Sequence, residues 1–484
     1  MGEGWRRVSG VGAPARASGL RWTTIAVGLA VGLDGAVRLA GAQATAPGQR
    51  PAFQNLRYEE DWSALRDPAL RRGFWDRLKF LPLDPDGRVW LSLGGEARVQ
   101  YERVDRPAFG RQPTDLGGYL SLRTALHADL HLGKRLRVFG QVLSGLQEGR
   151  AGGPRPTDVD TADLHQAFAE IGFPAGPLDR MGLRVGRQEM VVGSTRWLSV
   201  RDGPNLRRTF DALRVTAQAD RWRLDAWVSR PVAALPRAFD NVRDSSRSFA
   251  GAYLATTIPR LRGGVDLYGF RLERNPGAFA QGLANETRYT LGTRVWGRSG
   301  PFDHNTDAGW QWGEFGGAPA RAFVVVVDVG YTLQGWWTPR LGLRGSVSSG
   351  DRDPAEPALE SLNPHFPSAF VFTAPVGPVN LTNVHPTLDL HLSPRVTVVL
   401  DYNFFWRTRS TDGVYDAAGL PFTAAQNTRA RYLGSQPMLQ VRWAPATHLR
   451  FSAMVARFFA GPVLRDAVAA RDANLLQASL GLVF

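Results

Sequence analysis

The carboxyl end of the chain constrains the fold more than any other feature. Residues 476–484 alternate between apolar and small polar side chains, and successive side chains of a strand point to opposite faces. The apolar face carries Leu476, Ala478, Leu480, Leu482 and Phe484. The polar face carries Gln477, Ser479 and Gly481. A strand of this kind that ends in an aromatic residue is typical of a bacterial outer-membrane β-barrel. The alternative is a buried terminal strand of a soluble β protein.

The polarity of the chain favours strands over helices as membrane-crossing elements. Mean hydropathy is −0.22, and no apolar run reaches the roughly 20 residues that a spanning helix needs. A transmembrane β-barrel is compatible with this low hydropathy, because only half of the residues in each short strand have to be apolar.

The amino terminus has the pattern of a secretory signal peptide. An apolar stretch from Trp22 to Leu33 follows several arginines, and small residues come after it at 40–44. This order predicts the removal of residues 1–44, with cleavage after Ala42 or Ala44. The alternative is an uncleaved amphipathic anchor. We expect residues 45–90 to form an irregular periplasmic segment and residues 91–484 to form the barrel.

The rest of the chain repeats about ten alternating residues followed by a turn or loop rich in Gly, Pro, Asp or Asn. The pattern predicts strands at 91–101, 120–132, 135–143, 162–173, 181–189, 208–218, 221–230, 248–258, 263–272, 286–296, 309–316, 322–333, 339–348, 383–393, 395–406, 432–444, 447–458 and 473–484. These predict an all-β fold, a transmembrane antiparallel up-and-down β-barrel of about 18 strands, with 16 as the alternative, closed by the N-terminal and C-terminal strands. Short turns then lie at one rim, and long loops such as 349–382 and 407–431 lie at the other.

Charge and composition limit the function. The chain has no cysteine, which excludes disulfide scaffolds and thiol catalysis. The net charge of +14 falls to +11 without residues 1–44, which hold five arginines and two acids. Lys79 and Lys134 are the only lysines, so the positive charge is almost entirely arginine. Such a surplus suggests an anionic partner.

Nine arginines fall on the polar faces of the predicted strands. They are Arg98, Arg123, Arg137, Arg214, Arg223, Arg288, Arg294, Arg344 and Arg442. Acids share these faces, among them Glu96, Asp129 and Asp401. In a barrel this wide the set would line an aqueous lumen unless loops fill it. Two interpretations stay open. The arginines attract an anion in transit, or they form Arg–carboxylate pairs that brace the wall.

Ordered motifs extend through nearly the whole mature chain. They are 78–83 with 91–98; 185–189 with Gly193, Arg196 and 205–214; 349–351 with 363–367 and 380–381; and 405–407 with 412–415. Together they resemble the alginate-export family, the barrels through which some bacteria secrete alginate. The resemblance implies an eighteen-stranded monomer with an arginine-rich constriction that passes a polyuronate. The residues that match the family motifs include Arg187, Arg196, Arg207, Arg208, Asp211 and Asp351.

Arg187 breaks the alternation. Strict alternation places it on the lipid side with Leu183 and Val185, where a charge near the midplane costs about 2–4 kcal/mol. We therefore predict either a bulge at Gly186 that turns Arg187 inward or a position at the rim.

Other constellations are weaker. His127 and His131 lie about 13 Å apart on one strand at ~3.3 Å per residue, too far to share a metal. Trp310, Trp312, Trp336 and Trp337 fit either sugar stacking or, better, an interfacial aromatic girdle. The acidic loop at 351–360 fits a solvated loop better than a calcium site. No catalytic motif, cofactor site or metal site is expected.

These observations predict a channel in the outer membrane of a Gram-negative-type bacterium. It would pass an anionic polysaccharide of alginate type, or another anion, without chemistry. The alternatives are a diffusion porin for small anions or nutrients, and an adhesin or enzyme that uses its long loops. The expected partners are membrane lipid and the barrel-assembly machinery, which would recognise Phe484. We expect a monomer without a nucleic-acid partner.

Overall fold

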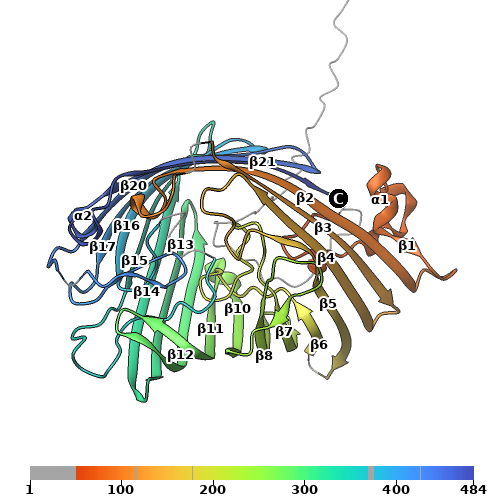
Figure 1. Ribbon diagram of the computed structural model, residues 1–484. Helices are drawn as coiled ribbons and strands as arrows, with labels where there is room; N and C mark the ends of the chain where they lie inside the picture. Colours follow the sequence, from red (N-terminus) through yellow and green to blue (C-terminus); the bar gives the residue numbers. More distant parts are fainter. Residues whose placement is uncertain (1–50, 115–116, 177, 369–374, 426) are drawn as a thin grey trace, which may run out of the picture.

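The computed structural model describes residues 51–114, 117–176, 178–368, 375–425 and 427–484. The predicted signal peptide, residues 1–44, lies outside the described residues. The described strands wrap into one closed antiparallel barrel (Figure 1). The predicted fold class is therefore confirmed.

Eighteen strands build the wall. They are β2 (Val89–Asp105), β3 (Tyr119–Leu132), β4 (Leu136–Glu148), β5 (Asp160–Ala175), β6 (Leu178–Gln188), β7 (Phe210–Ala219), β8 (Trp222–Ala233), β10 (Arg247–Ile258), β11 (Gly263–Phe279), β12 (Gly282–Ser299), β13 (Phe302–Phe315), β14 (Ala318–Thr332), β15 (Arg340–Ser348), β16 (Leu381–Ser393), β17 (Val396–Arg407), β20 (Tyr432–Ala446), β21 (Leu449–Ala460) and β22 (Ala473–Val483). Each pairs with its neighbours in sequence, as an up-and-down barrel requires.

Minor elements lie at the ends and in the loops. They are β1 (Leu81–Pro82), β9 (Val242–Arg243), β18 (Val414–Tyr415), β19 (Pro421–Thr423), α1 (Phe74–Lys79), α2 (Pro462–Val468) and five 3₁₀ turns (Arg57–Glu59, Ser63–Arg66, Pro68–Leu70, Pro107–Gly110 and Pro259–Leu261). No helix among the described residues is long and apolar enough to cross a membrane.

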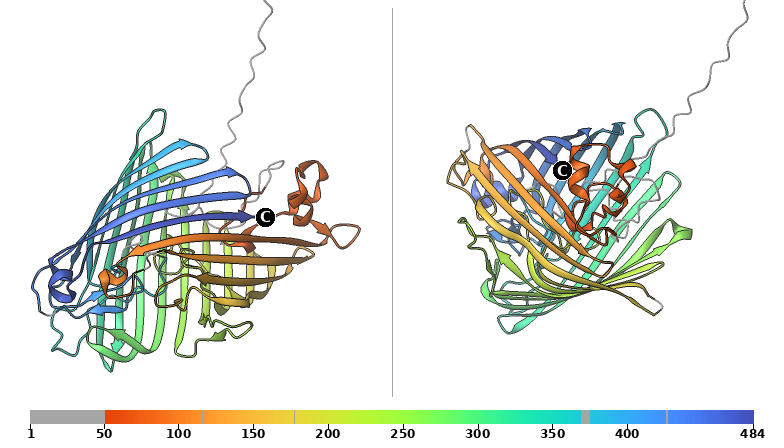
Figure 2. Two further views of the ribbon diagram at one scale, coloured as in Figure 1. Left: turned by 45° about the horizontal axis from the view of Figure 1, so that its top comes forward. Right: turned by 90° about the vertical axis from the view of Figure 1, so that its right-hand side faces the viewer.

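The last strand closes the barrel against the first. β22 pairs with β2 in a register that sets Val483 opposite Glu96 and Leu480 opposite Val99. The main chain of Phe484 extends this ladder to Gly95. The chain terminus therefore lies beside β2 (Figure 2). The predicted partnership between 473–484 and 91–101 is confirmed.

Alternation gives the wall an apolar outer face and a polar inner face. On β3, the outward residues Leu120, Leu122 and Leu126 are exposed, whereas Arg123 and His127 on the opposite face are buried. Exposed leucine and valine on strand after strand form a surface that a membrane can cover, since lipid replaces water along this face. The buried polar residues face inward, where loops cover them.

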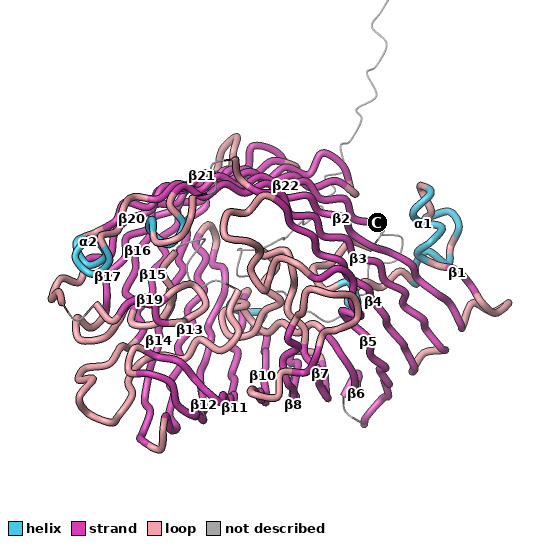
Figure 3. Tube along the Cα trace, viewed as in Figure 1, coloured by secondary structure: helices cyan, strands magenta, loops and turns pink. Residues whose placement is uncertain are grey.

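The two rims differ. Connections at one end are short, such as 133–135, 220–221 and 300–301, and we call this end the short-turn rim. The other end, the long-loop rim, carries the connections 189–209, 349–380 and 408–431. Figure 3 shows loops in the space enclosed by the strands. The inside of the barrel is therefore partly filled with chain.

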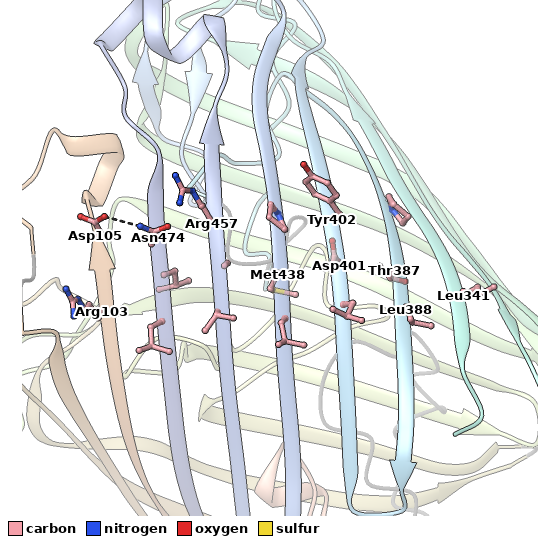
Figure 4. A pocket seen from close by; sticks show the side chains of 18 residues that line it. Arg103, Asp105, Leu341, Thr387, Leu388, Asp401, Tyr402, Met438, Arg457 and Asn474 are labelled. Carbon is pink, nitrogen blue, oxygen red and sulfur yellow. Dashed lines mark hydrogen bonds between the residues drawn. The ribbon is translucent and has the colours of Figure 1, made fainter. Parts of the chain in front are cut away.

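A shallow apolar groove of about 980 Å³ crosses the outer face from β2 to β15. Exposed Leu341, Leu400, Leu439, Val455 and Leu476 contribute to it. Figure 4 shows its lining residues, among which Asn474 of β22 donates a hydrogen bond to Asp105 of β2 at 3.0 Å. The groove faces away from the lumen, so it does not belong to the pathway.

Strand boundaries differ most at β13. We expected 309–316, but the strand begins at Phe302. Residues 302–308 contain Asp303, His304, Asn305 and Asp307, which weaken the apolar alternation. Tertiary pairing with β12 and β14 extends the strand nevertheless.

Candidate functional site

Two loops meet inside the barrel. Leu198 of loop 189–209 and Phe366 of loop 349–380 form a parallel bridge, and the amide of Phe366 donates to the carbonyl of Trp197 at 3.0 Å. Both loops pack on inward residues of β7, β8, β10, β11 and β14 in one buried cluster. Because the cluster joins these loops to the wall, they narrow the lumen as one unit.

The segment before the barrel also reaches inner-face residues. The Tyr58 hydroxyl donates to the carbonyl of Glu189 at 2.8 Å, and its ring packs edge-on against Phe139 and Phe168. Arg207 donates to the carbonyl of Asn55 at 2.9 Å. Residues 55–60 therefore lie within the barrel, in contact with loop 189–209. A periplasmic position for the rest of 45–90 stays a prediction.

All nine arginines that we selected from the sequence lie on strand faces opposite the exposed apolar residues. Seven of them contact a carboxylate within 4.0 Å: Arg123, Arg137, Arg214, Arg223, Arg288, Arg294 and Arg344. Arg442 is half-buried and lies opposite Ser452 of β21. The predicted bracing contacts are therefore present in much of the set. A role in passage stays a prediction for each residue.

Arg98 and Arg123 hold loop 189–209 against the wall. Arg98 donates to the carbonyls of Asp202 and Pro204, both at 2.7 Å. Arg123 contacts the Asp202 carboxylate at 2.7 Å and Glu96 at 2.8 Å. Burial alone would raise the pKa of Asp202, but Arg123 and Arg207 outweigh burial and hold that pKa well below its usual range. Asp202 therefore stays ionised and anchors the loop.

Arg207 makes the second anchor of this loop. Its guanidinium contacts Glu189 through two bonds of 2.6 and 2.9 Å, and Glu189 also meets His165 of β5 at 2.9 Å. A two-point contact between guanidinium and carboxylate fixes geometry as well as charge. Arg207, one of the family-motif residues, is thus part of the loop framework.

Arg214 of β7 and Arg223 of β8 share Asp225. Their Nε atoms lie 3.0 and 2.9 Å from its two carboxylate oxygens. Arg214 also donates to the Tyr58 hydroxyl at 3.3 Å. Two guanidiniums therefore share one carboxylate. Glu59 lies beside them, where burial raises its pKa and Arg223 and Arg214 oppose that rise.

Similar clusters occupy other parts of the inner wall. Arg344 and Arg340 share Asp328 at 3.1 and 2.9 Å. Arg294 contacts Asp266 at 2.9 Å. Arg288 contacts Glu286 at 3.0 Å.

The two other acids that we selected also have partners. Asp129 accepts from Arg137 at 2.7 Å and lies 3.3 Å from His131. Asp401 accepts from His385 at 2.9 Å. Both carboxylates are therefore engaged within the wall.

Arg208 differs from these braced arginines. Its guanidinium donates to the carbonyl of Ser199 at 3.2 Å and lies 5.1 Å from the centre of the Phe366 ring. Among the described residues it has no carboxylate within ion-pair distance. Burial, then Arg201 and Arg247, lower the pKa of Arg208 to about 9. Three arginines therefore gather where loop 189–209 meets β10. Arg247 pairs with Asp244 at 3.4 Å, so an anion there would chiefly relieve the repulsion between Arg201 and Arg208.

Arg187 shows that the predicted bulge is wrong. The register runs through Gly186 without a shift on both sides of β6, with Gly186 opposite Phe168 and Ala212. Arg187 stays on the outward face and contacts Asp211 at 3.0 Å. The pair lies at the long-loop ends of β6 and β7, so the rim alternative is the correct one. Gly186 adopts a φ of +129° that keeps the strand continuous without a bulge.

The remaining motif residues tie loops to the wall. Arg196 lies 3.7 Å from Asp307 of β13. The Asp351 carboxylate accepts from Gln281 at 2.6 Å, and its amide donates to Asp412 at 3.0 Å. Asp351 thereby connects loops 349–380 and 408–431 to the turn between β11 and β12.

The sequence did not single out Asp202 or Arg201. Both lie in a loop, where alternation carries no information about direction. A usable signal was present, because residues 201–208 hold three arginines in eight positions, an unusual density for a loop that also contains Gly203, Pro204 and Asn205.

The histidine and tryptophan constellations have defined surroundings. His131 stacks on Trp90 at 3.9 Å and His127 stacks on Phe139 at 5.5 Å. Trp310 and Trp312 lie on the outer face and are exposed. Trp336 is 93% exposed in the turn between β14 and β15. The tryptophan positions suit an interfacial girdle.

Comparison with known proteins identifies relatives of this barrel. The family model for alginate export matches residues 89–476. No curated protein matches the sequence. Among solved structures, the Acinetobacter baumannii protein OccAB1 superimposes with a TM-score of 0.58 at 10% identity, covering 85% of this chain and 99% of its own.

Two further structures show the same fold. Pseudomonas aeruginosa OccD3 (OpdP) gives a TM-score of 0.55 at 13% identity, and the alignment covers 86% of this chain and 96% of OccD3. A BenF-like porin from Pseudomonas fluorescens Pf-5 gives a TM-score of 0.54 at 12% identity, and the alignment covers 81% of this chain and 99% of the porin. At sequence identities of 10–13%, these similarities show a shared fold alone.

Proposed function

Because this chain belongs to the alginate export family of outer-membrane channels, we propose that it passes an anionic polysaccharide, or another anion, through an arginine-lined lumen. Passage would be passive and biased by charge, without a chemical step. We expect the barrel to work as a monomer, with the long-loop rim outside the cell. Its terminal Phe484 would be recognised during barrel assembly, and the signal peptide would be removed on export.

The observation that carries the proposal is the cluster of Arg201, Arg208 and Arg247. Arg208 lacks a carboxylate partner among the described residues, and Arg201 has a pKa lowered by burial and then by Arg155. Arg247 pairs with Asp244 at 3.4 Å, so Arg201 and Arg208 are the guanidiniums available to a carboxylate. Partners spaced along a wall let a chain exchange contacts without being trapped. The braced arginines instead supply the rigid frame that positions this cluster.

A diffusion porin for small anions is the second candidate. Loops 189–209 and 349–380 meet inside the barrel at the Leu198–Phe366 bridge, and a narrowed lumen suits a small solute better than a polymer. The shared fold with the BenF-like porin also fits this candidate.

Planar-bilayer recording tests the proposal. We expect the native channel to select anions, and the double variant Arg201→Gln/Arg208→Gln to shift the reversal potential toward zero selectivity in a salt gradient. Arg352→Gln/Arg465→Gln is the matched control. Arg352 lies in loop 349–380 and Arg465 in α2, both are exposed, and the double variant removes the same charge away from the cluster. A native reversal potential without anion preference would refute the proposal.

The two candidates differ in how a polymer acts on the current. Oligouronates of increasing length should block the native channel progressively if it passes a polyanion. A large current that oligouronates leave unchanged, while small carboxylates permeate, would favour the porin. Loss of block in the double variant but not in the control would place the polymer contact at Arg201 and Arg208.

A further inference from the structure

A basic pocket of about 480 Å³ lies at the short-turn rim, away from the arginine cluster discussed above. It is formed where the turn between β10 and β11 meets the turn between β12 and β13. Its lining includes Arg260, Arg262, Arg298 and His304, with Val295 and Trp296 as apolar walls. No acidic residue is among its lining residues.

The three arginines of this pocket are exposed and lack carboxylate partners among the described residues. Arg298 donates only to the carbonyl of Gly300, at 3.3 Å. The nearest acid along the ladder is Asp303, which lies opposite Arg298 but is engaged by Arg340 at 2.6 Å. Arg298 shares the inner face of β12 with Arg294, but unlike Arg294 it has no carboxylate within ion-pair distance among the described residues. The pocket therefore keeps its positive charge for an external anion.

The pocket lies across the edge of the wall, so it opens toward the membrane as well as toward water. Val295 belongs to the exposed apolar face of β12, and His304 shares the outward face of β13 with Phe302. In the next turn along this rim, Trp336 and Trp337 are exposed. Tryptophan gathers at headgroup depth in membranes. Arg260 and Arg262, in the turn between β10 and β11, therefore lie at the rim where lipid phosphates are expected, and Arg298 lines the same pocket from the inner face of β12.

We propose that this pocket binds the phosphate group of an anionic phospholipid from the leaflet at the short-turn rim. Arginine can grip phosphate oxygens through two parallel bonds, and basic pockets of membrane proteins bind anionic headgroups. Arg260 and Arg262 would approach the phosphate from one turn and Arg298 from the other. Val295 would contact the start of an acyl chain.

Native mass spectrometry of the purified full-length barrel tests the pocket. The probes are dioctanoyl phosphatidylglycerol and dioctanoyl phosphatidylcholine, with inorganic phosphate as competitor. We expect phosphatidylglycerol to bind about tenfold more tightly than phosphatidylcholine, as several charge-assisted bonds allow. The variant Arg260→Gln/Arg262→Gln/Arg298→Gln should abolish this preference.

The control variant is Arg180→Gln/Arg221→Gln/Arg395→Gln, which removes three charges from the same rim but none from the pocket. It should keep the lipid preference. An equal loss in both variants would overturn the proposal, because rim charge in general would then explain binding. Displacement of the lipid by millimolar phosphate would reassign the pocket to a free anion, and displacement by an oligouronate would reassign it to the permeating polymer.

Discussion

The main chains of Gly95 and Phe484 exchange two hydrogen bonds, of 2.9 and 3.0 Å, and complete the seam of the barrel. The same terminal residue contacts the segment before the barrel. Its carbonyl accepts from Arg57 at 2.9 Å, and its ring lies 4.4 Å from that of Trp75. Phe484 thus joins the first strand, the last strand and the N-terminal segment.

Truncation of the terminal ring should weaken this junction. Phe484→Ala removes the contact with Trp75, so we expect about 2–4 kcal/mol of lost stability and a smaller fraction of heat-resistant folded barrel on semi-native gels. Phe459→Ala is the control, because that ring is partly exposed on the outer face. An equal loss of stability in Phe484→Ala and Phe459→Ala would show that the contact with Trp75 contributes no more than an ordinary outer-face ring.

Loss of the carboxylate shared by Arg214 and Arg223 should destabilise the wall. Asp225→Asn leaves two guanidiniums without their counter-charge, and breaking a buried pair costs about 3–5 kcal/mol. The melting temperature in detergent should fall. The exposed pair Arg221–Asp220, 67% and 87% exposed, supplies the control Asp220→Asn, which should cost under about 1 kcal/mol. An unchanged melting temperature for Asp225→Asn would contradict a bracing role.

The anchor of loop 349–380 should depend on pH. Burial, and then the neighbouring Asp412, raise the pKa of Asp351 to about 6 from its ordinary 3.8. A raised carboxyl pKa favours the protonated form in the folded state. The stabilisation is therefore complete below about pH 4 and is lost as pH rises through about 6.

Hydrogen exchange measures this dependence. After correction for intrinsic rates, amides around Asp351 should exchange faster at pH 7 than at pH 4.5. Asp351→Asn should remove the difference, whereas Asp353→Asn, at an exposed position, should preserve it. A pH-independent native loop would argue against titration of Asp351.

Gly186 should not tolerate a side chain. Its φ is +129°, and an added Cβ would lie 2.2 Å from the carbonyl oxygen of Ala167. We expect Gly186→Ala to cost at least about 1–3 kcal/mol, since the backbone conformation is strained for alanine. Gly140→Ala is the control, because a Cβ there meets nothing within 4 Å. A stable Gly186→Ala barrel would mean that β6 adjusts locally.

The strands were predictable because one physical rule governs them all. A wall between lipid and a polar interior requires alternation, and alternation is visible in residues such as Leu120 to Leu132. The same rule correctly assigned Arg123 to the inner face. It could not assign its partner, because Asp202 comes from a loop 79 residues away in sequence.

The candidate site was less predictable for the same reason. Arg208 was selected only through its motif, and Arg201 was missed, because loop direction depends on packing against distant strands. At Gly186 the sequence suggested a bulge, although a glycine can also absorb an unusual φ within an unbroken ladder. The charge of Arg187 was then satisfied at the rim by Asp211.

The contact between Arg57 and the Phe484 carbonyl makes completion of the wall a condition for seating the segment inside it. The acceptor is in position only when β22 has paired with β2. A chain truncated a few residues before Phe484 would lack both main-chain hydrogen bonds to Gly95 and the acceptor for Arg57. The pairing of β22 with β2 and the seating of residues 55–60 inside the barrel should therefore be thermodynamically coupled through this one residue.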